Sequence, residues 1–119
     1  MPLSHLEPLT VLRYATGEQV QNHFDFVDPQ ARHYATELAR HGQRRLTFLI
    51  YLNDDYTGGE TDFPQLGIRF KGDKGAGLFF VNADEEDVPD QRMLHAGLPP
   101  SAGEKWIVSQ FIRSRPTLG

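Results

Sequence analysis

A histidine and an aspartate two residues apart, His23 and Asp25, are the residues whose types and spacing best suit a chemical role. Residues 19–27 have the pattern of a strand, in which side chains two apart point to the same face. An imidazole beside a carboxylate supplies two of the three ligands of the 2-His-1-carboxylate triad, which holds iron(II) and leaves positions open for substrate and oxygen. Because such a pair is common by chance, the hypothesis requires a distant second histidine and an anchor for a co-substrate.

His95 is the candidate for the second histidine, because it lies near the end of a predicted strand over residues 91–96, just before Ala-Gly-Leu-Pro. His33 and His41 are eight residues apart on a predicted helix, roughly 80° around it at ~100° per residue, so they do not form the i, i+4 pair of a helical metal site. His5 lies close to the N-terminus. Taken alone, a histidine in this position is more often a capping or core residue than a ligand, and it is the other features of the constellation that favour a ligand.

Lys105 is the candidate anchor, because it lies within an otherwise apolar strand predicted over residues 104–113. Burying a lysine without an anionic partner is costly, and a carboxylate of a co-substrate would supply that partner. The alternative is a lysine at a strand edge whose ammonium group extends to water. Tyr14 and Tyr51, on two other predicted strands, offer hydroxyls for the same carboxylate or simply pack in the core.

The elements that would position these residues are mainly strands. Turn residues, including a Gly-Gly pair at 58–59 and Gly-Asp-Lys-Gly at 72–75, separate short segments rich in β-forming residues. Eight short strands favour a double-sheet jelly roll, a mainly β fold that can hold a ligand between its sheets. Asp28 and Pro29 indicate a helix start and Gly42 a helix end, so a helix or lid is expected over residues 29–41. The strands are predicted over residues 9–14, 19–27, 45–53, 60–63, 67–71, 76–82, 91–96 and 104–113.

Composition excludes several other classes of function. The chain has 119 residues, which suits one domain, and a formal net charge of -4, which argues against general nucleic-acid binding. It contains no cysteine, so zinc–thiolate sites, iron–sulfur clusters and cysteine nucleophiles are excluded. No apolar run approaches the ~18 residues that span a bilayer, and no signal-peptide pattern is present. We therefore expect no membrane partner and a cytoplasmic location.

Several stretches, taken together and in order, resemble the iron(II)- and 2-oxoglutarate-dependent dioxygenases, specifically their prolyl 4-hydroxylase-like branch. The resemblance extends from about residue 9 to residue 113. The stretches that carry it are Leu-Arg-Tyr (12–14), His-Phe-Asp (23–25), Arg-Leu-Thr-Phe-Leu-Ile-Tyr-Leu-Asn-Asp (45–54), Gly-Gly-Glu-Thr-Asp-Phe-Pro (58–64), His-Ala-Gly-Leu-Pro (95–99) and Gly-Glu-Lys-Trp (103–106).

The resemblance implies a double-stranded β-helix, a cupin-like jelly roll, in which His23, Asp25 and His95 hold iron(II) and act as the catalytic centre. It implies that Lys105 pairs with the distal carboxylate of 2-oxoglutarate (2OG). Tyr14 and Tyr51 are expected to assist Lys105, Thr61 to line the same pocket, and Phe111 to lie on the substrate side, where many relatives carry tryptophan. A lysine anchor is typical of this branch and argues against the nucleic-acid demethylases of the superfamily.

The expected function is therefore hydroxylation of a C–H bond, most plausibly in a prolyl residue of a protein or peptide. Oxygen and 2OG would be consumed, succinate and carbon dioxide formed, and ascorbate would serve as reductant. A free amino acid or small molecule is the alternative substrate, and a non-catalytic cupin-like binding module or an inactive hydroxylase fragment is the alternative function. Residues 1–119 are expected to form a single catalytic domain that lacks the N-terminal helical region of its relatives. The sequence does not indicate an oligomeric state.

Overall fold

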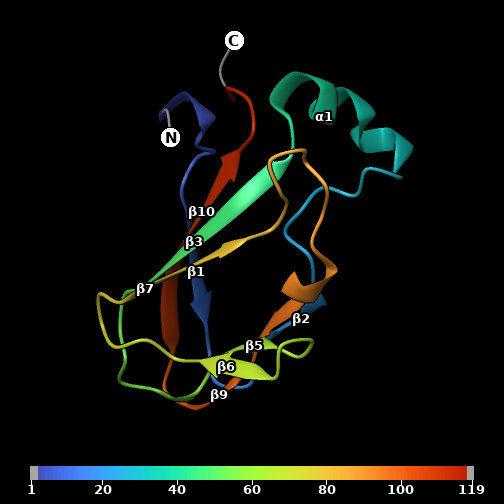
Figure 1. Cartoon of the computed structure of the whole chain (residues 1–119). Helices are drawn as coiled ribbons and strands as arrows, with labels where there is room; N and C mark the ends of the chain where they lie inside the picture. The colour runs from blue at the N-terminus through green and yellow to red at the C-terminus, as the bar shows by residue number, and fades with distance from the viewer. Residues whose placement is uncertain (1–2, 118–119) are drawn as a thin grey trace.

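Two four-stranded antiparallel sheets face each other in the computed structural model of the chain, which describes residues 3–117 (Figure 1). This is the predicted jelly roll. The first sheet has the order β1 (Thr10–Tyr14), β10 (Lys105–Arg113), β3 (Arg44–Tyr51) and β7 (Gly77–Val81). The second has the order β2 (Val20–His23), β8 (His95–Gly97), β5 (Thr61–Phe63) and β6 (Ile68–Phe70).

Strand β3 is central to the first sheet, as its apolar sequence predicts. It pairs with β10 on one side, with Tyr51 opposite Ile107, and with β7 on the other, with Leu49 opposite Leu78. Strand β10 also pairs with β1, so that Lys105 lies opposite Tyr14. Because side chains alternate along a strand, this register places Tyr14, Tyr51 and Lys105 on the same inner face of the sheet.

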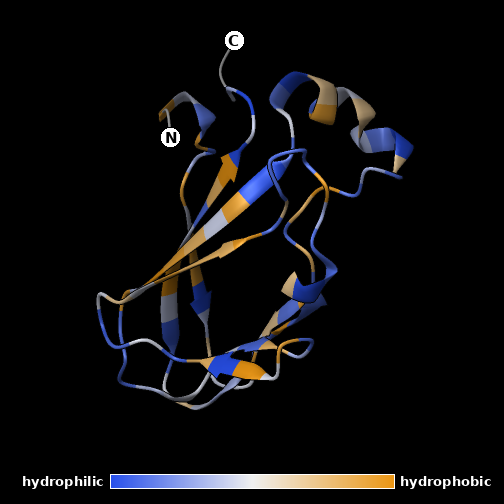
Figure 2. Ribbon diagram, viewed as in Figure 1, coloured by the Kyte–Doolittle hydropathy of each residue, from blue (hydrophilic) through white to orange (hydrophobic). Residues whose placement is uncertain are grey.

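The core lies between the two sheets and contains more aromatic than aliphatic side chains. Figure 2 shows hydrophobic residues concentrated along β3, β7 and β10, whereas the connecting turns at the lower end of the molecule are mostly hydrophilic. Residues buried together in this cluster are Tyr14, Leu49, Tyr51, Tyr56, Phe63, Phe80 and Ile107. The two tyrosines predicted to assist Lys105 therefore also belong to the core.

The strand predicted over residues 19–27 ends earlier, at His23. The backbone groups of Val27 bond a side chain instead of a neighbouring strand: its N–H donates to Gln43 Oε1 at 2.6 Å, and its C=O accepts from Gln43 Nε2 at 2.8 Å. Gln43 is buried, so this pairing satisfies polar groups that would otherwise require a strand ladder. The chain is thereby free to turn at Asp25.

The helix predicted to begin at Asp28 begins later. The Asp28 carboxylate accepts the N–H of Gln30, two residues on, which stabilises a local turn instead of a helix N-terminus. A 3₁₀ turn, η2 (Arg32–Tyr34), precedes the helix α1 (Ala35–His41). Gly42 ends α1 as predicted, with a φ of 69° and its N–H donating to Leu38 O.

The prediction of a strand over residues 91–96 is wrong in its first half. Asp90 caps a 3₁₀ turn, η3 (Gln91–Met93), by accepting the N–H of Arg92, and β8 starts only at His95. A further pair, β4 (Thr57–Gly58) with β9 (Pro100–Ala102), and the 3₁₀ turn η1 (Leu3–His5) were not predicted. These segments are too short, and too rich in Gly and Pro, to show a period of two. None of the helices in residues 3–117 has the length and apolar character needed to cross a bilayer.

A buried arginine, Arg113, joins the end of β10 to α1 and to the N-terminal segment. Its guanidinium donates to Glu7 at 3.2 Å, to Glu37 at 2.9 Å and to the carbonyl of Gly42 at 2.7 Å. Replacing Arg113 with Met should lower the free energy of unfolding by about 3 kcal/mol, because it removes the donor of the Gly42 carbonyl and the charged partner of Glu37, and leaves Glu7 with Arg44 alone. Urea denaturation measures this, with Arg92→Ala as control, since Arg92 makes only an exposed pair with Asp90. Equal effects of the two substitutions would contradict this account.

Candidate metal centre and the adjoining cavity

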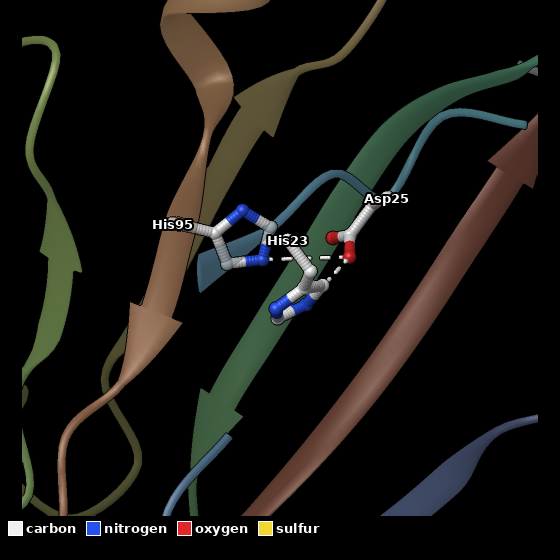
Figure 3. A group of neighbouring side chains, drawn as sticks. All are labelled: His23, Asp25 and His95. Carbon is white, nitrogen blue, oxygen red and sulfur yellow. Dashed lines mark ion pairs between the residues drawn. The ribbon is translucent and has the colours of Figure 1, made fainter. Parts of the chain in front are cut away.

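His23, Asp25 and His95 converge at one point between the two sheets (Figure 3). His23 ends β2 and His95 begins β8, and the two residues lie opposite each other in the ladder. Asp25 follows two residues after His23. Its Oδ1 atom lies 3.2 Å from Nε2 of His23 and 3.4 Å from Nε2 of His95. The three residues that the sequence singles out are thus brought together.

Both imidazoles are held in the orientation that a metal ligand requires. Nδ1 of His23 bonds the carbonyl of Gln21 at 2.8 Å, and Nδ1 of His95 bonds the carbonyl of Met93 at 2.8 Å. Because a carbonyl only accepts, each Nδ1 carries a proton, which leaves Nε2 as the atom that faces Asp25. Nε2 donates to the carboxylate when the ring is protonated and can bind a metal when it is not. Such carbonyl contacts fix the tautomer and ring direction of metal-ligating histidines.

The carboxylate of Asp25 is kept ionised inside the protein. Burial alone would raise its pKa, but hydrogen bonds with His23, His95 and Thr47 outweigh burial and hold the pKa well below the usual range. The hydrogen bond to Asp25 in turn raises the pKa of His23. A buried anion surrounded by nitrogen donors is an environment that favours a bound cation.

The donor set fits a divalent transition metal. Neighbouring ligands of a metal bound at about 2.1 Å lie about 3 Å apart, close to the separations between Asp25 Oδ1 and the two Nε2 atoms. Two imidazoles and one carboxylate also match the ligands of the iron(II) facial triad. The rings of Phe63 and Phe80 pack around His95, with centroids 5.5 Å and 4.9 Å away, so the metal position is bordered by apolar groups.

A cavity of about 110 Å³ extends from the triad to Lys105. That volume accommodates roughly eight water-sized groups, which suits a small acid and not a large ligand. The remaining lining residues come from β1, β2, β3, β5, β8 and β10: Leu12, Tyr14, Val20, Leu49, Thr61, Ala96, Gly97, Ile107, Ser109 and Phe111. Its walls are mainly apolar, with charged groups at the triad and at Lys105.

Lys105 is 1% exposed and has no carboxylate partner among residues 3–117. Its Nζ donates to the carbonyl of Gly59 at 2.8 Å and lies 5.0 Å from the ring centroid of Tyr14 and 5.5 Å from that of Tyr51. Burial lowers the pKa of Lys105 to about 8. A buried ammonium group at a cavity wall, whose hydrogen-bond partner here is a carbonyl and not a carboxylate, is suited to bind the carboxylate of a ligand.

Tyr14, Tyr51 and Thr61 surround this end of the cavity in different ways. Tyr14 lines it directly, and Gly97 allows this close approach, because a Cβ there would lie 3.2 Å from the Tyr14 hydroxyl. Tyr51 is fully buried behind the wall, with its hydroxyl 2.6 Å from Thr61 Oγ1 and 3.3 Å from the carbonyl of Phe70. Thr61 lines the cavity, so Tyr51 acts on it through Thr61 and through its ring beside Lys105.

Phe111 lies at the opposite end of the cavity from Lys105, six residues along the same strand face. The guanidinium of Arg44 stacks over its ring at 4.1 Å. Arg44 also lines a second hollow of about 560 Å³, bordered by Phe24, Phe26 and Tyr34 among others. The two hollows therefore adjoin at the Arg44–Phe111 contact.

Sequence reasoning did not identify Thr47 and Asn82, two fully buried polar residues behind Asp25. Thr47 bonds the Asp25 carboxylate at 2.7 Å, and Asn82 bonds Thr47 at 2.8 Å. The only signal in the sequence was a threonine at a buried position of an apolar strand.

Residues 9–113 match the 2OG-Fe(II) oxygenase superfamily, and the chain belongs to this family. It is 34% identical over 133 residues to prolyl 4-hydroxylase 2 of Arabidopsis thaliana, covering 94% of this chain and 43% of that protein. It is 35% identical over 109 residues to prolyl 4-hydroxylase subunit alpha-2 of Gallus gallus, covering 92% and 20%. The chain thus spans less than half the length of these curated relatives.

Among solved structures, the chain resembles the viral collagen prolyl hydroxylase from Paramecium Bursaria Chlorella virus-1 in complex with 2OG. The TM-score is 0.78 at 36% sequence identity, covering 92% of this chain and 59% of that one. A prolyl-4-hydroxylase of Pseudomonas putida shares the fold, with a TM-score of 0.61 at 19% identity. The family predicted from the sequence and its jelly-roll fold are confirmed.

Replacing Lys105 with Met should stabilise the protein when neither metal nor 2OG is bound. The pKa of Lys105 falls from 10.5 to about 8, and each unit corresponds to about 1.4 kcal/mol. With the lost bond to Gly59 as an offset, we expect a gain of about 2 kcal/mol in the free energy of unfolding at pH 7. The buried charge is costly below pH 8, so the gain should shrink as pH rises from 8 towards 10.5. Denaturation at pH 7 and 9 measures it, and a destabilised variant at pH 7 would contradict the account.

The affinity of the Mn(II)-loaded protein for 2OG should fall as pH rises above about 8, because the ammonium group of Lys105 then loses its proton. Tyr14 and Tyr51 stay neutral over this range, since burial raises the pKa of both hydroxyls. Calorimetry at pH 7, 8 and 9 tests this. The matched control is Lys105→Arg, which remains charged and should show a flat profile. If the 2OG affinities of the parent and of Lys105→Arg fell in parallel as pH rises, Lys105 would be excluded as the titrating group.

Proposed function

We propose that this chain carries the catalytic domain of an iron(II)- and 2OG-dependent dioxygenase that hydroxylates a prolyl residue of a protein or peptide. One observation supports this most strongly: the His23–Asp25–His95 cluster and the ammonium of Lys105, which has no carboxylate partner among residues 3–117, lie at two points of one small cavity. The similarity to prolyl 4-hydroxylases over most of the chain supports the choice of substrate.

In this proposal Nε2 of His23, Nε2 of His95 and Oδ1 of Asp25 are the three metal ligands. Iron(II), when bound, supplies the oxidising chemistry that converts 2OG and oxygen to succinate and carbon dioxide and hydroxylates the substrate. Lys105 binds the distal carboxylate of 2OG by a charge-assisted hydrogen bond and thereby sets how far the acid extends towards the triad. Ascorbate is the expected reductant.

The residues around the cavity position the co-substrate and exclude water. Tyr14 and Thr61 present hydroxyls beside the carboxylate that Lys105 binds, and Tyr51 orients Thr61. Leu49, Ile107 and the rings around His95 form an apolar wall that strengthens the charge pairing inside.

The substrate is expected to approach from the side of Phe111. The hollow beyond the Arg44–Phe111 contact is large enough for several residues of an extended peptide, and its aromatic border suits the apolar ring of proline. The segment before α1, which carries Tyr34, would then form one rim of the substrate site.

Replacing Asp25 with Ala should abolish iron binding and reduce turnover at least a hundredfold, since it removes a ligand and the charge that both histidines face. The assay measures succinate formed from 2OG by anaerobically iron-loaded protein with ascorbate, before and after oxygen is admitted. The parent should form succinate only with oxygen, and a proline-rich peptide should increase the rate.

Full turnover by Asp25→Ala would show that the ligand assignment is wrong. A parent protein that binds iron and 2OG but forms no succinate would show that the chain is a binding module or an inactive fragment. Stimulation by a free amino acid, but not by any proline-containing peptide, would exclude the proposed substrate class.

A further inference from the structure

The two oxygens of the Asp25 carboxylate have different environments. Oδ1 faces Nε2 of both histidines, at 3.2 and 3.4 Å. Oδ2 points the other way and accepts a hydrogen bond of 2.7 Å from the hydroxyl of Thr47 on β3. Only Oδ1 is therefore directed at the position that a metal ion would occupy.

The direction of the hydrogen bonds behind Asp25 follows from the chemistry of the groups. An ionised carboxylate only accepts, so the single proton of the Thr47 hydroxyl is donated to Asp25. Thr47 Oγ1 then accepts from Nδ2 of Asn82, 2.8 Å away. Asn82 follows β7 and is held on both sides, because its N–H donates to Arg45 O and its C=O accepts from Asp90 N, each at 2.8 Å.

This chain of hydrogen bonds leaves one polar atom without a partner. Oδ1 of Asn82 is buried and has no hydrogen-bond partner among residues 3–117. Rotating the amide would not help, because Oδ1 would then face a Thr47 oxygen whose proton is already donated. A buried unpaired amide oxygen costs about 1–3 kcal/mol, so an apolar side chain at position 82 would be at least as stable. Asn82 is thus better explained by the hydroxyl and the carboxylate that it orients than by stability.

We propose that Thr47 and Asn82 are positioning residues that hold Asp25 as a one-oxygen metal ligand. A carboxylate binds a metal through one oxygen or through both, and the second mode occupies a further coordination position. With Oδ2 bonded to Thr47, Asp25 leaves free the adjacent positions that 2OG needs to chelate through two oxygens. This inference rests on the proposed function, and it adds that access of the co-substrate depends on a hydrogen-bond chain outside the cavity lining.

The test uses binding without turnover. Thr47→Val keeps the shape of the side chain and removes the hydroxyl, whereas Thr47→Ser keeps the hydroxyl. Calorimetry under argon gives the affinity of each protein for Mn(II), and then the affinity of the Mn(II)-saturated protein for 2OG. Loss of an outer-shell partner typically lowers metal affinity 10–100-fold. We expect such a loss for Thr47→Val, a further loss of about tenfold in 2OG affinity, and values within threefold of the parent for Thr47→Ser.

A second variant, Asn82→Leu, retains the Thr47 hydroxyl but removes the donor that directs it, so a smaller loss in both affinities is expected. It also serves if Thr47→Val fails to fold. Thermal melting of the metal-free proteins separates the two roles, because a purely structural pair would change the melting temperature without changing either affinity.

Parent-like affinities in both Thr47→Val and Asn82→Leu would overturn the inference, as would equal losses in Thr47→Val and Thr47→Ser. If the parent and the variants all bound Mn(II) equally well, this inference would be overturned but the proposed function would stand. A parent that binds no Mn(II) would overturn the proposed function, and the inference with it.

Discussion

The antiparallel pairing of β10 with β3 is the constraint on which the rest of the site depends. Side chains alternate along a strand, so this register sends Lys105, Ser109 and Phe111 inward on β10. It sends Thr47, Leu49 and Tyr51 inward on β3. A slip of one residue would expose the lysine and bury Trp106 in its place. This one pair of strands thus provides Lys105, part of the cavity wall and the Thr47 hydroxyl that bonds Asp25.

The second sheet supplies His23 and His95, and groups that are costly to bury lie between the two sheets. An ionised carboxylate, a buried ammonium and a buried unpaired amide oxygen all lie close to the same cavity. Each is unfavourable in an apolar interior without a partner. The aromatic core and the network around Arg113 provide the stability that lets the fold retain them. Groups that are unfavourable for stability and that gather at one place are typical of functional sites.

The residue types with specific chemistry were sufficient to predict which side chains the fold brings together at this cavity. His23, Asp25, His95 and Lys105 could be identified from the sequence because spacing, strand alternation and a lysine in an apolar strand each carry physical meaning. The central position of β3 and the end of α1 at Gly42 could be identified for the same reason. The family resemblance then supplied the expected roles of Tyr14, Tyr51, Thr61 and Phe111, which periodicity alone left open.

Other features depend on contacts between distant segments and could not be predicted. The early end of β2 results from the amide of Gln43, sixteen residues away from Val27. The hydrogen bond between Asn82 and Thr47 joins residues 35 positions apart. The carboxylates of Asp28 and Asp90 each accept a hydrogen bond from the backbone N–H two residues on. Such local hydrogen bonds stabilise a turn and compete with a regular helix or strand.

One metal ion at the triad and one molecule of 2OG at Lys105 are expected to occupy this cavity together. Crystals grown anaerobically with Mn(II) and 2OG, measured at a wavelength where manganese scatters anomalously, test it directly. The account predicts one strong anomalous peak about 2.1 Å from Nε2 of His23, Nε2 of His95 and Oδ1 of Asp25. It also predicts a carboxylate of the co-substrate at Lys105. A peak elsewhere, or 2OG bound away from Lys105, would contradict the account.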